Sequence, residues 1–249
     1  MSEMRKGWTT GACAAAAARG AASFLRTGTW PDLVEIRLPK GVTARFALTA
    51  MSHGPGWAEA GVVKDAGDDP DVTHGALVLA RVEKGPSGSG LVFKAGEGVG
   101  TVTLSGLPIP IGEPAITPGP RAQIAANLAG LGDDFIVTLS MPQGRELARK
   151  TMNERLGVVG GLSILGTTGV VMPYSNAAWI GAIQRAVDVA RANGLSHIAA
   201  ATGSASERAA QKHHGLGDLA LIDIGGFAGA FLKYLKRHPV QHVTLAGGF

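Results

Sequence analysis

The sequence predicts an α/β arrangement for its second half, in which a parallel sheet is covered by helices on both faces. Two observations support this prediction. From about residue 175, expected helices alternate with short expected strands, and the strands are apolar throughout instead of alternating with polar residues. Parallel strands buried on both faces have this composition, and the alternation of elements is typical of the crossover connections between such strands.

The first half predicts a different pattern, of strands joined by turns. An Ala-rich helix is expected from Thr10 to about Leu25, because alanine has the highest helix propensity, and Thr10 is its expected N-cap. Alternating strands are expected at 34–38 and 44–48, with the turn Lys40-Gly41 between them. The remaining elements expected here are strands at 58–63, 76–82, 91–94 and 135–139, and a short helix at 121–131.

In the second half, Ser175 is expected to cap a helix that ends at Gly194. After it we expect strands at 197–201, 219–224 and 242–246, a helix at 204–213, and a helix carrying Phe227, Phe231 and Leu235. Ligands of parallel sheets bind beyond the carboxyl ends of the strands. These ends are rich in glycine and small hydroxyl residues, which predicts a backbone-lined nucleotide pocket, with glycine packing as the alternative. The expected cofactor-binding residues are Thr202, Gly203, Ser204, Glu207, Asp223, Gly225, Gly226, Gly247 and Gly248.

Composition limits the classes of function. Hydrophobic residues make up 45% and charged residues 17% of the 249 residues, which excludes a disordered chain. No uncharged apolar run reaches the roughly 20 residues that span a bilayer, and the first residues lack a secretory apolar core, so we expect a cytoplasmic protein without membrane contact. The single Cys13 excludes an internal disulfide and a cysteine-based zinc site.

Charge favours a small anionic partner. The net charge of +4 is mild, aromatic residues are few, and no basic run is interleaved with them, so nucleic acid is not expected as a partner. A polyanionic small molecule fits this balance better. A homo-oligomer is compatible with the sequence.

The segment Val62 to Gly75, VVKDAGDDPDVTHG, is the strongest candidate for chemistry; we call it the acidic loop. It carries Asp65, Asp68, Asp69, Asp71 and His74, and Gly67 and Pro70 interrupt regular structure. Like charges so close repel one another unless cations, donors or solvent offset them. Either the aspartates bind a hard cation, as in a metal-dependent hydrolase or phosphotransferase, or they accept backbone amides in a solvated turn.

Three further segments are candidate anion sites. The helix start at Thr9, Thr10 and Gly11 offers free amides, although a capping threonine without a ligand explains it equally well. Gly96, Gly98 and Gly100 resemble a phosphate loop, but no helix follows, which leaves a carboxylate nest or a glycine-rich hairpin. Basic residues able to bind carboxylates are Lys64, Arg121, Arg149, Lys150 and Arg155.

Several motifs together resemble the cobalt-precorrin-5B C1-methyltransferases of cobalamin (vitamin B12) biosynthesis, the CbiD family. They extend in the family's order over nearly the whole chain, and their joint specificity is high. The matching stretches are GWTTGACAAAA at 7–17, the acidic loop, GEGVGTVT at 96–103, GEPAITPGPR at 112–121, TMNERLG at 151–157 and GGLSILGTTGVV at 160–171.

The resemblance implies an enzyme that transfers a methyl group from S-adenosylmethionine to C-1 of cobalt-precorrin-5B, giving cobalt-precorrin-6A. It implies an α+β N-terminal domain over 1–152 that carries the acidic loop, followed by an α/β Rossmann-like domain over 153–249 with a mostly parallel sheet. Family members continue past Phe249 with a tail that this sequence does not contain, so we expect the second domain to lack that tail.

Within this interpretation the substrate is a polycarboxylate corrinoid, which the acidic loop would repel. We therefore expect Asp65, Asp68, Asp69, Asp71 and His74 to be catalytic, with His74 as the proton-transfer group, and assign no metal site. We expect Asp68→Asn and Asp69→Asn to leave stability unchanged or slightly raised. A non-catalytic corrinoid-binding protein is a further alternative. The expected substrate-binding residues are Thr9, Thr10, Gly11, Lys64, Gly96, Gly98, Gly100, Arg121, Thr167 and Thr168.

Overall fold

The computed structural model describes residues 4–248, which form two compact units. The first unit contains the chain up to Val102 together with Gly112–Asn153 and Val158–Tyr174. The second unit contains Thr103–Ile111, Glu154–Gly157 and the chain from Ser175 onward. Each unit has its own hydrophobic core.

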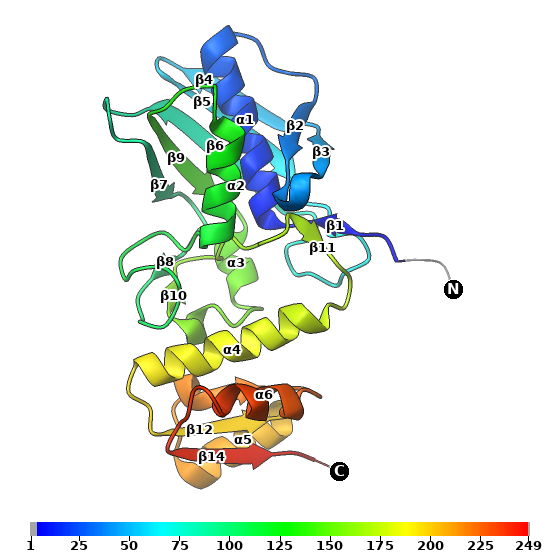
Figure 1. Ribbon diagram of the computed structural model, residues 1–249, viewed down its shortest axis with the longest axis vertical. Coiled ribbons are helices and arrows are strands. Elements are labelled where there is room, and N and C mark those ends of the chain that lie inside the picture. The colour runs from blue at the N-terminus through cyan, green and yellow to red at the C-terminus, as the bar shows by residue number, and fades with distance from the viewer. Residues whose placement is uncertain (1–3, 249) are drawn as a thin grey trace. The chain divides into compact units, whose positions relative to one another are not determined.

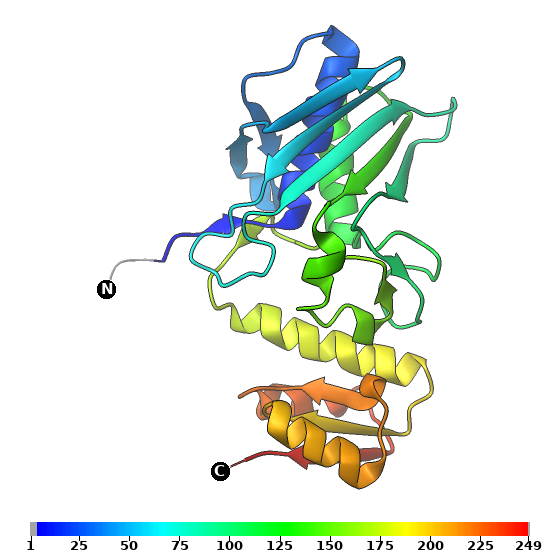
Figure 2. The same cartoon turned by 180° about the vertical axis from the view of Figure 1, so that it is seen from behind.

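A five-stranded mixed sheet forms the centre of the first unit, in the order β4-β5-β6-β9-β7. Neighbouring strands are antiparallel except β7 and β9, which are parallel. Helices α1 and α2 lie side by side on one face of this sheet (Figures 1 and 2). The bounds are α1 Thr10–Thr27, β4 Ala50–Gly54, β5 Trp57–Val63, β6 Leu77–Lys84, β7 Leu91–Ala95, α2 Pro118–Leu128 and β9 Phe135–Ser140.

Helix α1 is buried because its side chains are small. Every residue of Ala12–Ala18 has no exposed surface, and the helix packs on β5, β6 and α2. Alanine combines high helix propensity with a low profile, so the helix axis can approach the sheet closely. The N-cap is Thr9 and not the predicted Thr10: Thr9 has an extended backbone and its Oγ1 accepts a hydrogen bond from Ala12 N at 3.1 Å.

Short strands and turns complete the first unit. Strands β2 (Val34–Arg37) and β3 (Thr43–Phe46) form the predicted hairpin, and Lys40 and Gly41 have positive φ in the turn (η1, Pro39–Gly41). Two-residue strands pair antiparallel, β1 with β11 and β8 with β10. The bounds are β1 Gly7–Trp8, β8 Thr101–Val102, α3 Gly144–Ala148, β10 Val158–Val159 and β11 Val170–Val171.

The second unit contains a three-stranded parallel sheet in the order β13-β12-β14. Helices α4 and α6 pack on one face through Ile183, Val187 and Phe231, and α5 packs on the other through Ala210 (Figures 1 and 2). The bounds are η2 Glu154–Leu156, α4 Asn176–Ala192, β12 His197–Ala201, α5 Ser204–His214, η3 Asp218–Ala220, β13 Leu221–Asp223, α6 Ala228–Leu235 and β14 His242–Ala246.

The prediction of a Rossmann-like domain with a mostly parallel sheet is wrong. The strands of residues 4–248 are distributed over five sheets. Most strand pairs are antiparallel, and the largest sheet, with five strands, is mixed, so the chain is a mixed α+β protein. The apolar segment Gly157–Val171 contributes only β10 and β11, which pair antiparallel inside the first unit. Three strands therefore remain for the parallel sheet, fewer than a doubly wound fold requires.

Candidate functional site

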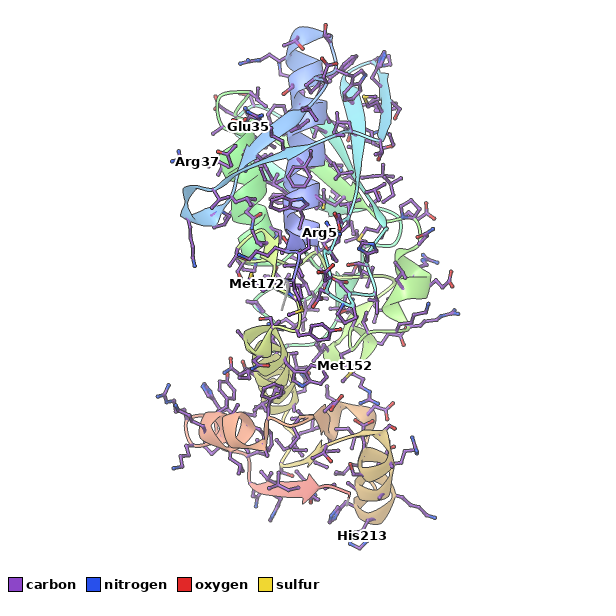
Figure 3. The ribbon with its side chains drawn as sticks, turned by 90° about the vertical axis from the view of Figure 1, so that its right-hand side faces the viewer. Arg5, Glu35, Arg37, Met152, Met172 and His213 are labelled. Carbon is purple, nitrogen blue, oxygen red and sulfur yellow. The ribbon has the colours of Figure 1, made fainter. Side chains whose placement is uncertain are left out.

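The first half of the acidic loop is held by the N-terminal segment. Both terminal nitrogens of Arg5 donate to the Asp65 carboxylate, at 2.5 and 2.9 Å, and Gly67 N donates to it at 2.9 Å. Arg5 is labelled in Figure 3. The Arg5 hydrogen bonds, and then that of Gly67, lower the pKa of Asp65 to about 2. Asp65 is therefore ionised at neutral pH and serves as an anchor for Arg5.

Asp68 and Asp69 accept hydrogen bonds from backbone amides of distant segments. Arg5 N donates to Asp68 Oδ2 at 2.7 Å, and Tyr174 N donates to Asp69 Oδ1 at 2.9 Å. Tyr174 has a positive φ of 54°, an uncommon conformation for a residue with a side chain. Asp68 thus connects the loop to the N-terminal segment at Arg5, and Asp69 connects it to the segment at Tyr174.

Lys64 and Asp71 form an ion pair inside the first unit. Lys64 is 1% exposed, and its Nζ donates to Asp71 Oδ2. Asp71 Oδ1 accepts from Thr73 N at 2.8 Å and from Thr73 Oγ1 at 2.6 Å. Burial acts to raise the pKa of Asp71, but the charge of Lys64 and these hydrogen bonds outweigh it, so the pKa is lowered. The Lys64 ammonium is thus paired with Asp71, and its predicted contact with a substrate stays a prediction.

His74 combines a structural contact with a free ring nitrogen. Its Nδ1 accepts a hydrogen bond from Ala66 N at 3.1 Å, so in the neutral ring Nε2 carries the proton. The side chain is 54% exposed, and Nδ1 lies 3.9 Å from Asp65 Oδ1. Among the loop residues His74 therefore presents an exposed N–H donor at Nε2, and its proton-accepting nitrogen is the one bound to Ala66 N.

The loop carboxylates do not converge on one point. Each of the four aspartates accepts from a lysine, an arginine or a backbone amide, so the repulsion expected from the sequence is offset by donors. Over residues 4–248, no group of three or more His, Cys, Asp or Glu side chains is placed to hold a metal ion. The geometry thus gives no support to the hard-cation interpretation of the loop.

The predicted anion site at the start of α1 is covered by protein. Gly11 N donates to Leu165 O at 2.9 Å, and Ala12 N is capped by Thr9. A Cβ atom added to Gly11 would lie 2.7 Å from the Pro120 ring. Thr10, the first residue of the helix, is buried, so the helix start is a packing point between α1 and the segment around Leu165.

The glycines of the 96–100 segment permit close backbone contacts. A Cβ added to Gly98 would lie 1.8 Å from Met141 O, and one added to Gly100 would lie 2.5 Å from Val158. A Cβ added to Gly96 would meet the Ser140 hydroxyl at 2.0 Å. Leu162 N donates to Gly98 O at 2.8 Å. The geometry supports glycine packing here, and no open nest is formed around Gly98.

The other predicted substrate-binding residues differ in accessibility. Arg121 donates to Ile116 O at 2.9 Å and pairs with Glu113 at 3.1 Å, so its guanidinium is largely occupied. Thr168 Oγ1 donates to Val170 O at 3.0 Å. Thr167 lies in the same turn, next to Gly166, whose carbonyl accepts from Gln123 at 3.0 Å. This turn is a surface feature of the first unit, fixed by α2.

In the second unit, the predicted cofactor-binding strand ends lie side by side. Ala201 at the end of β12 pairs in register with Asp223 of β13 and with Ala246 of β14. Thr202 N donates to Ala246 O at 3.1 Å, which fixes two of the loops that follow the strands. A Cβ added to Gly203, Gly226 or Gly248 would meet nothing within 4 Å, so this edge of the sheet exposes its backbone.

Two predicted members of this group are already engaged. Glu207, in the first turn of α5, forms a two-point ion pair with Arg155 at 2.8 and 2.9 Å. Gly225 has a φ of +46°, and an added Cβ would lie 3.2 Å from the ring of Trp179. Its amide donates to Asp223 Oδ1 at 3.1 Å. Ser204 begins α5, and Gly247 follows β14 at the same edge.

Sequence reasoning missed the residues that hold the loop. Arg5 and Tyr174 lie far from it in sequence, and neither belongs to a recognisable motif; Arg5 is simply part of a basic pair next to Gly7. The signal in the sequence is the charge itself: four nearby aspartates need cationic partners, and Arg5 and Lys64 are two basic residues that provide them.

The fold and these geometries define an α+β protein with a glycine-lined strand edge in one unit and a charge-paired acidic loop in the other. The family model CbiD matches residues 1–173. A solved structure described as cobalamin biosynthesis protein (cbiD) from Archaeoglobus fulgidus is 30% identical, with a TM-score of 0.55, over 98% of this chain and 77% of that one. The chain belongs to the CbiD family.

Curated relatives carry a more specific name. A protein from a Bradyrhizobium species is 59% identical over 99% of this chain and 67% of its own length. One from Paramagnetospirillum magneticum is 56% identical over 99% of this chain and 71% of its own length. Both are named cobalt-precorrin-5B C(1)-methyltransferase.

Proposed function

We propose that this chain is the C-methyltransferase that converts cobalt-precorrin-5B to cobalt-precorrin-6A in cobalamin biosynthesis, with S-adenosylmethionine as methyl donor. The observation that supports it most directly is the 55–59% identity, over nearly the whole chain, to relatives with that name. The proposal includes a polycarboxylate corrinoid as substrate and a cytoplasmic location. Within residues 4–248 no helix has the length and apolar composition needed to cross a membrane.

The donor is assigned to the strand edge within residues 153–249. Its adenosine and amino-acid parts need exposed backbone and a few polar groups, and Gly203, Gly226 and Gly248 leave the backbone open there. The Asp223 carboxylate and Thr202 are exposed at the same edge. The chain places β13 on one side of β12 and β14 on the other, so the strand order changes side at β12. Ligands of parallel sheets bind at such points. When bound, S-adenosylmethionine supplies an electrophilic methyl group on a sulfonium.

We assign a catalytic role to the acidic loop, within residues 1–152, and His74 is the residue that transfers a proton. His74 takes up a proton at Nδ1, which releases the hydrogen bond from Ala66 N, and the resulting imidazolium returns a proton from the exposed Nε2. The four aspartates, which we predict to share in catalysis, also hold the loop that carries His74, through Arg5, Lys64 and backbone amides.

The test of the activity is a product assay. We expect the purified chain to add one methyl group to cobalt-precorrin-5B in the presence of S-adenosylmethionine, as read by mass spectrometry. Binding of the corrinoid without any methylated product would support a non-catalytic corrinoid-binding protein and contradict the proposal. Phosphate-ester or other hydrolysis that depends on an added divalent cation would support the hydrolase alternative.

The role of His74 is tested with His74→Asn. Asn Oδ1 can accept from Ala66 N as Nδ1 does, so the melting temperature should stay close to that of the unaltered chain while the group that titrates is lost. We expect single-turnover methyl transfer to slow at least tenfold, equivalent to about 1.4 kcal/mol of transition-state stabilisation. His53→Asn, an exposed histidine on β4, is the matched control and should keep the full rate. An unchanged rate in His74→Asn would remove His74 from the mechanism.

A further inference from the structure

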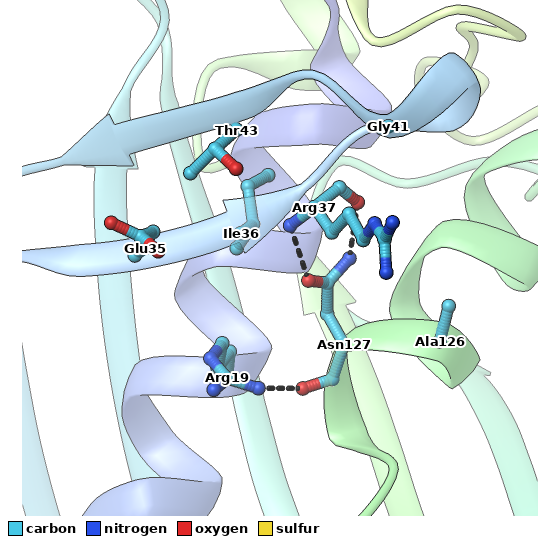
Figure 4. A pocket seen from close by; sticks show the side chains of 8 residues that line it. All are labelled: Arg19, Glu35, Ile36, Arg37, Gly41, Thr43, Ala126 and Asn127. Atoms are coloured by element: carbon cyan, nitrogen blue, oxygen red, sulfur yellow. Dashed lines mark hydrogen bonds between the residues drawn. The ribbon is translucent and has the colours of Figure 1, made fainter.

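The first unit contains a cavity of about 360 Å³ that lies apart from the acidic loop. It is bounded by α1, by the β2–β3 hairpin and by α2 (Figure 4). Its size falls within the range of small-ligand pockets. The lining residues are Arg19, Glu35, Ile36, Arg37, Gly41, Thr43, Ala126 and Asn127.

Asn127 contacts the Arg37 backbone and the Arg19 guanidinium. It is 3% exposed, its Oδ1 accepts from Arg37 N at 2.8 Å, and its Nδ2 donates to Arg37 O at 3.0 Å. Its own carbonyl accepts from Arg19 Nη1 at 2.6 Å. Nδ2 also donates to Gln123 O at 2.8 Å, so every polar atom of this side chain is satisfied. Asn127 therefore holds the backbone of β2 at Arg37 and one nitrogen of Arg19, and its side-chain amide is not free for a ligand.

The cavity carries an excess of positive charge. The Arg37 guanidinium, whose backbone alone is held by Asn127, makes no hydrogen bond or ion pair with the part of the chain that the structure describes. Arg19 uses one terminal nitrogen for Asn127 O, which leaves its other donors available. The one acidic residue of the wall, Glu35, is paired with Arg45 at 3.1 Å. Figure 4 shows the two guanidinium groups on either side of Asn127.

We propose that this cavity is an anion site that binds a carboxylate group of a small polycarboxylate. Guanidinium forks bind carboxylates through two parallel hydrogen bonds, and two such forks around one cavity select for a ligand with more than one carboxylate. The Thr43 hydroxyl lies on the cavity wall and offers a further polar contact. The site rests on this geometry alone and does not depend on the proposed methyl transfer.

Calorimetric titration with citrate at low ionic strength tests the site. Arg37→Gln should weaken citrate binding at least tenfold, because it removes one fork, while the backbone contacts to Asn127 and hence the melting temperature are retained. Arg37→Lys should recover only part of the affinity, because an ammonium cannot replace the planar fork. Arg19→Gln provides an independent variant and should weaken binding in the same direction.

The control is Lys94→Gln, which removes one positive charge from the exposed strand β7 of the same unit. It should bind citrate normally. Three results would each overturn the proposal. They are equal weakening of citrate binding by Lys94→Gln, no citrate binding by the unaltered chain, and binding of inorganic phosphate in place of citrate. Competition by cobyrinic acid, a corrinoid polycarboxylate, would show that the site accepts carboxylate arms of corrinoids, whereas citrate binding without such competition would indicate a separate small ligand. Both results support a carboxylate site.

Discussion

Lys64 is the most constrained charged residue of the first unit. Its side chain is 1% exposed, and within residues 4–248 its ion-pair partner is Asp71. The desolvation of a buried ammonium is costly, so the pair is stable only while both partners are present. The residue that the sequence offered as a carboxylate-binding cation is thus part of the framework.

Asp71→Asn should destabilise the protein by about 3 kcal/mol, because it leaves the buried ammonium of Lys64 without a counter-charge. The double variant Lys64→Met with Asp71→Asn should recover most of that loss, because neither charge remains. Free energies of unfolding in urea at neutral pH measure both. Losses that simply add in the double variant would show that the two side chains are not coupled.

Residue types could be predicted at these positions, but their partners could not. The acidic loop and His74 stand out by composition, whereas the contacts of Arg5 and Tyr174 with Asp65, Asp68 and Asp69 arise only when distant segments meet. Those donors offset the self-repulsion of the aspartates, so the effect of Asp68→Asn and Asp69→Asn on stability, expected from the sequence to be neutral, stays a prediction.

At the scale of elements, hydrophobic pattern predicted most helices and strands to within a few residues. The strands at 197–201 and 242–246 were predicted with their observed bounds. Strand β4 was missed because its residues, Ala50–Gly54, lack apolar alternation and are mostly exposed at the edge of the sheet. The two-residue strands depend on tertiary pairing and have no local signal.

The glycine-rich segment at 96–100 provides a prediction that separates packing from ligand binding. Gly98→Ala should cost about 3 kcal/mol or more, because its Cβ would overlap the Met141 carbonyl. Gly88→Ala is the control: it has a similar positive φ of 79° but nothing within 4 Å, so only backbone strain of about 1 kcal/mol is expected. Chemical unfolding of both variants decides; equal losses would contradict the packing role of Gly98.

A histidine cluster joins the C-terminus of α5 to the amino ends of β12 and β14. His214 Nε2 lies 3.1 Å from Thr244 Oγ1, which in turn lies 2.9 Å from His197 Nε2. The His213 and His197 rings are 4.6 and 4.8 Å from the His214 ring, and His242 is 6.0 Å from His197. Desolvation and then the charges of His213 and His197 lower the pKa of His214.

Because the folded-state pKa of His214 is lowered, its contribution to stability is present above its unfolded pKa of about 6.5 and is lost as pH falls below it. We expect the melting temperature to fall more between about pH 8 and about pH 5.5 for the unaltered chain than for His214→Gln. Scanning calorimetry at several pH values measures this difference. Parallel curves for the two proteins would show that the cluster does not titrate with unfolding.

At the scale of the whole molecule, the sequence predicted the elements of the second half correctly and the class of fold, a Rossmann-like domain, wrongly. Alternating helices and strands do form a parallel sheet, but only β12, β13 and β14 belong to it. The segment Gly157–Val171 is as apolar as a strand run, yet its glycines allow it to pair in two short pieces with β8 and β1. Composition alone does not reveal which strand an apolar segment will pair with.

The same three strands give the last prediction, which concerns donor binding. Gly225→Leu is a poor test because Gly225 has positive φ and lies against the Trp179 ring. Gly203 has an extended backbone, with φ 175°, and open space around a Cβ, so Gly203→Leu should keep the melting temperature while its side chain fills the strand edge. We expect S-adenosylhomocysteine to bind at least tenfold more weakly to this variant, about 1.4 kcal/mol by calorimetry.

Gly217→Leu is the matched control for Gly203→Leu. Gly217 is also extended and open, but it precedes the amino end of β13, away from the carboxyl ends of the strands. A side chain there adds similar apolar surface without reaching the edge formed by Thr202, Asp223 and Gly248, so donor binding should be unchanged. Normal binding of S-adenosylhomocysteine by Gly203→Leu would place the donor elsewhere. Equal weakening by both variants would point to a general disturbance of the second unit, and melting temperatures of the same samples distinguish that case.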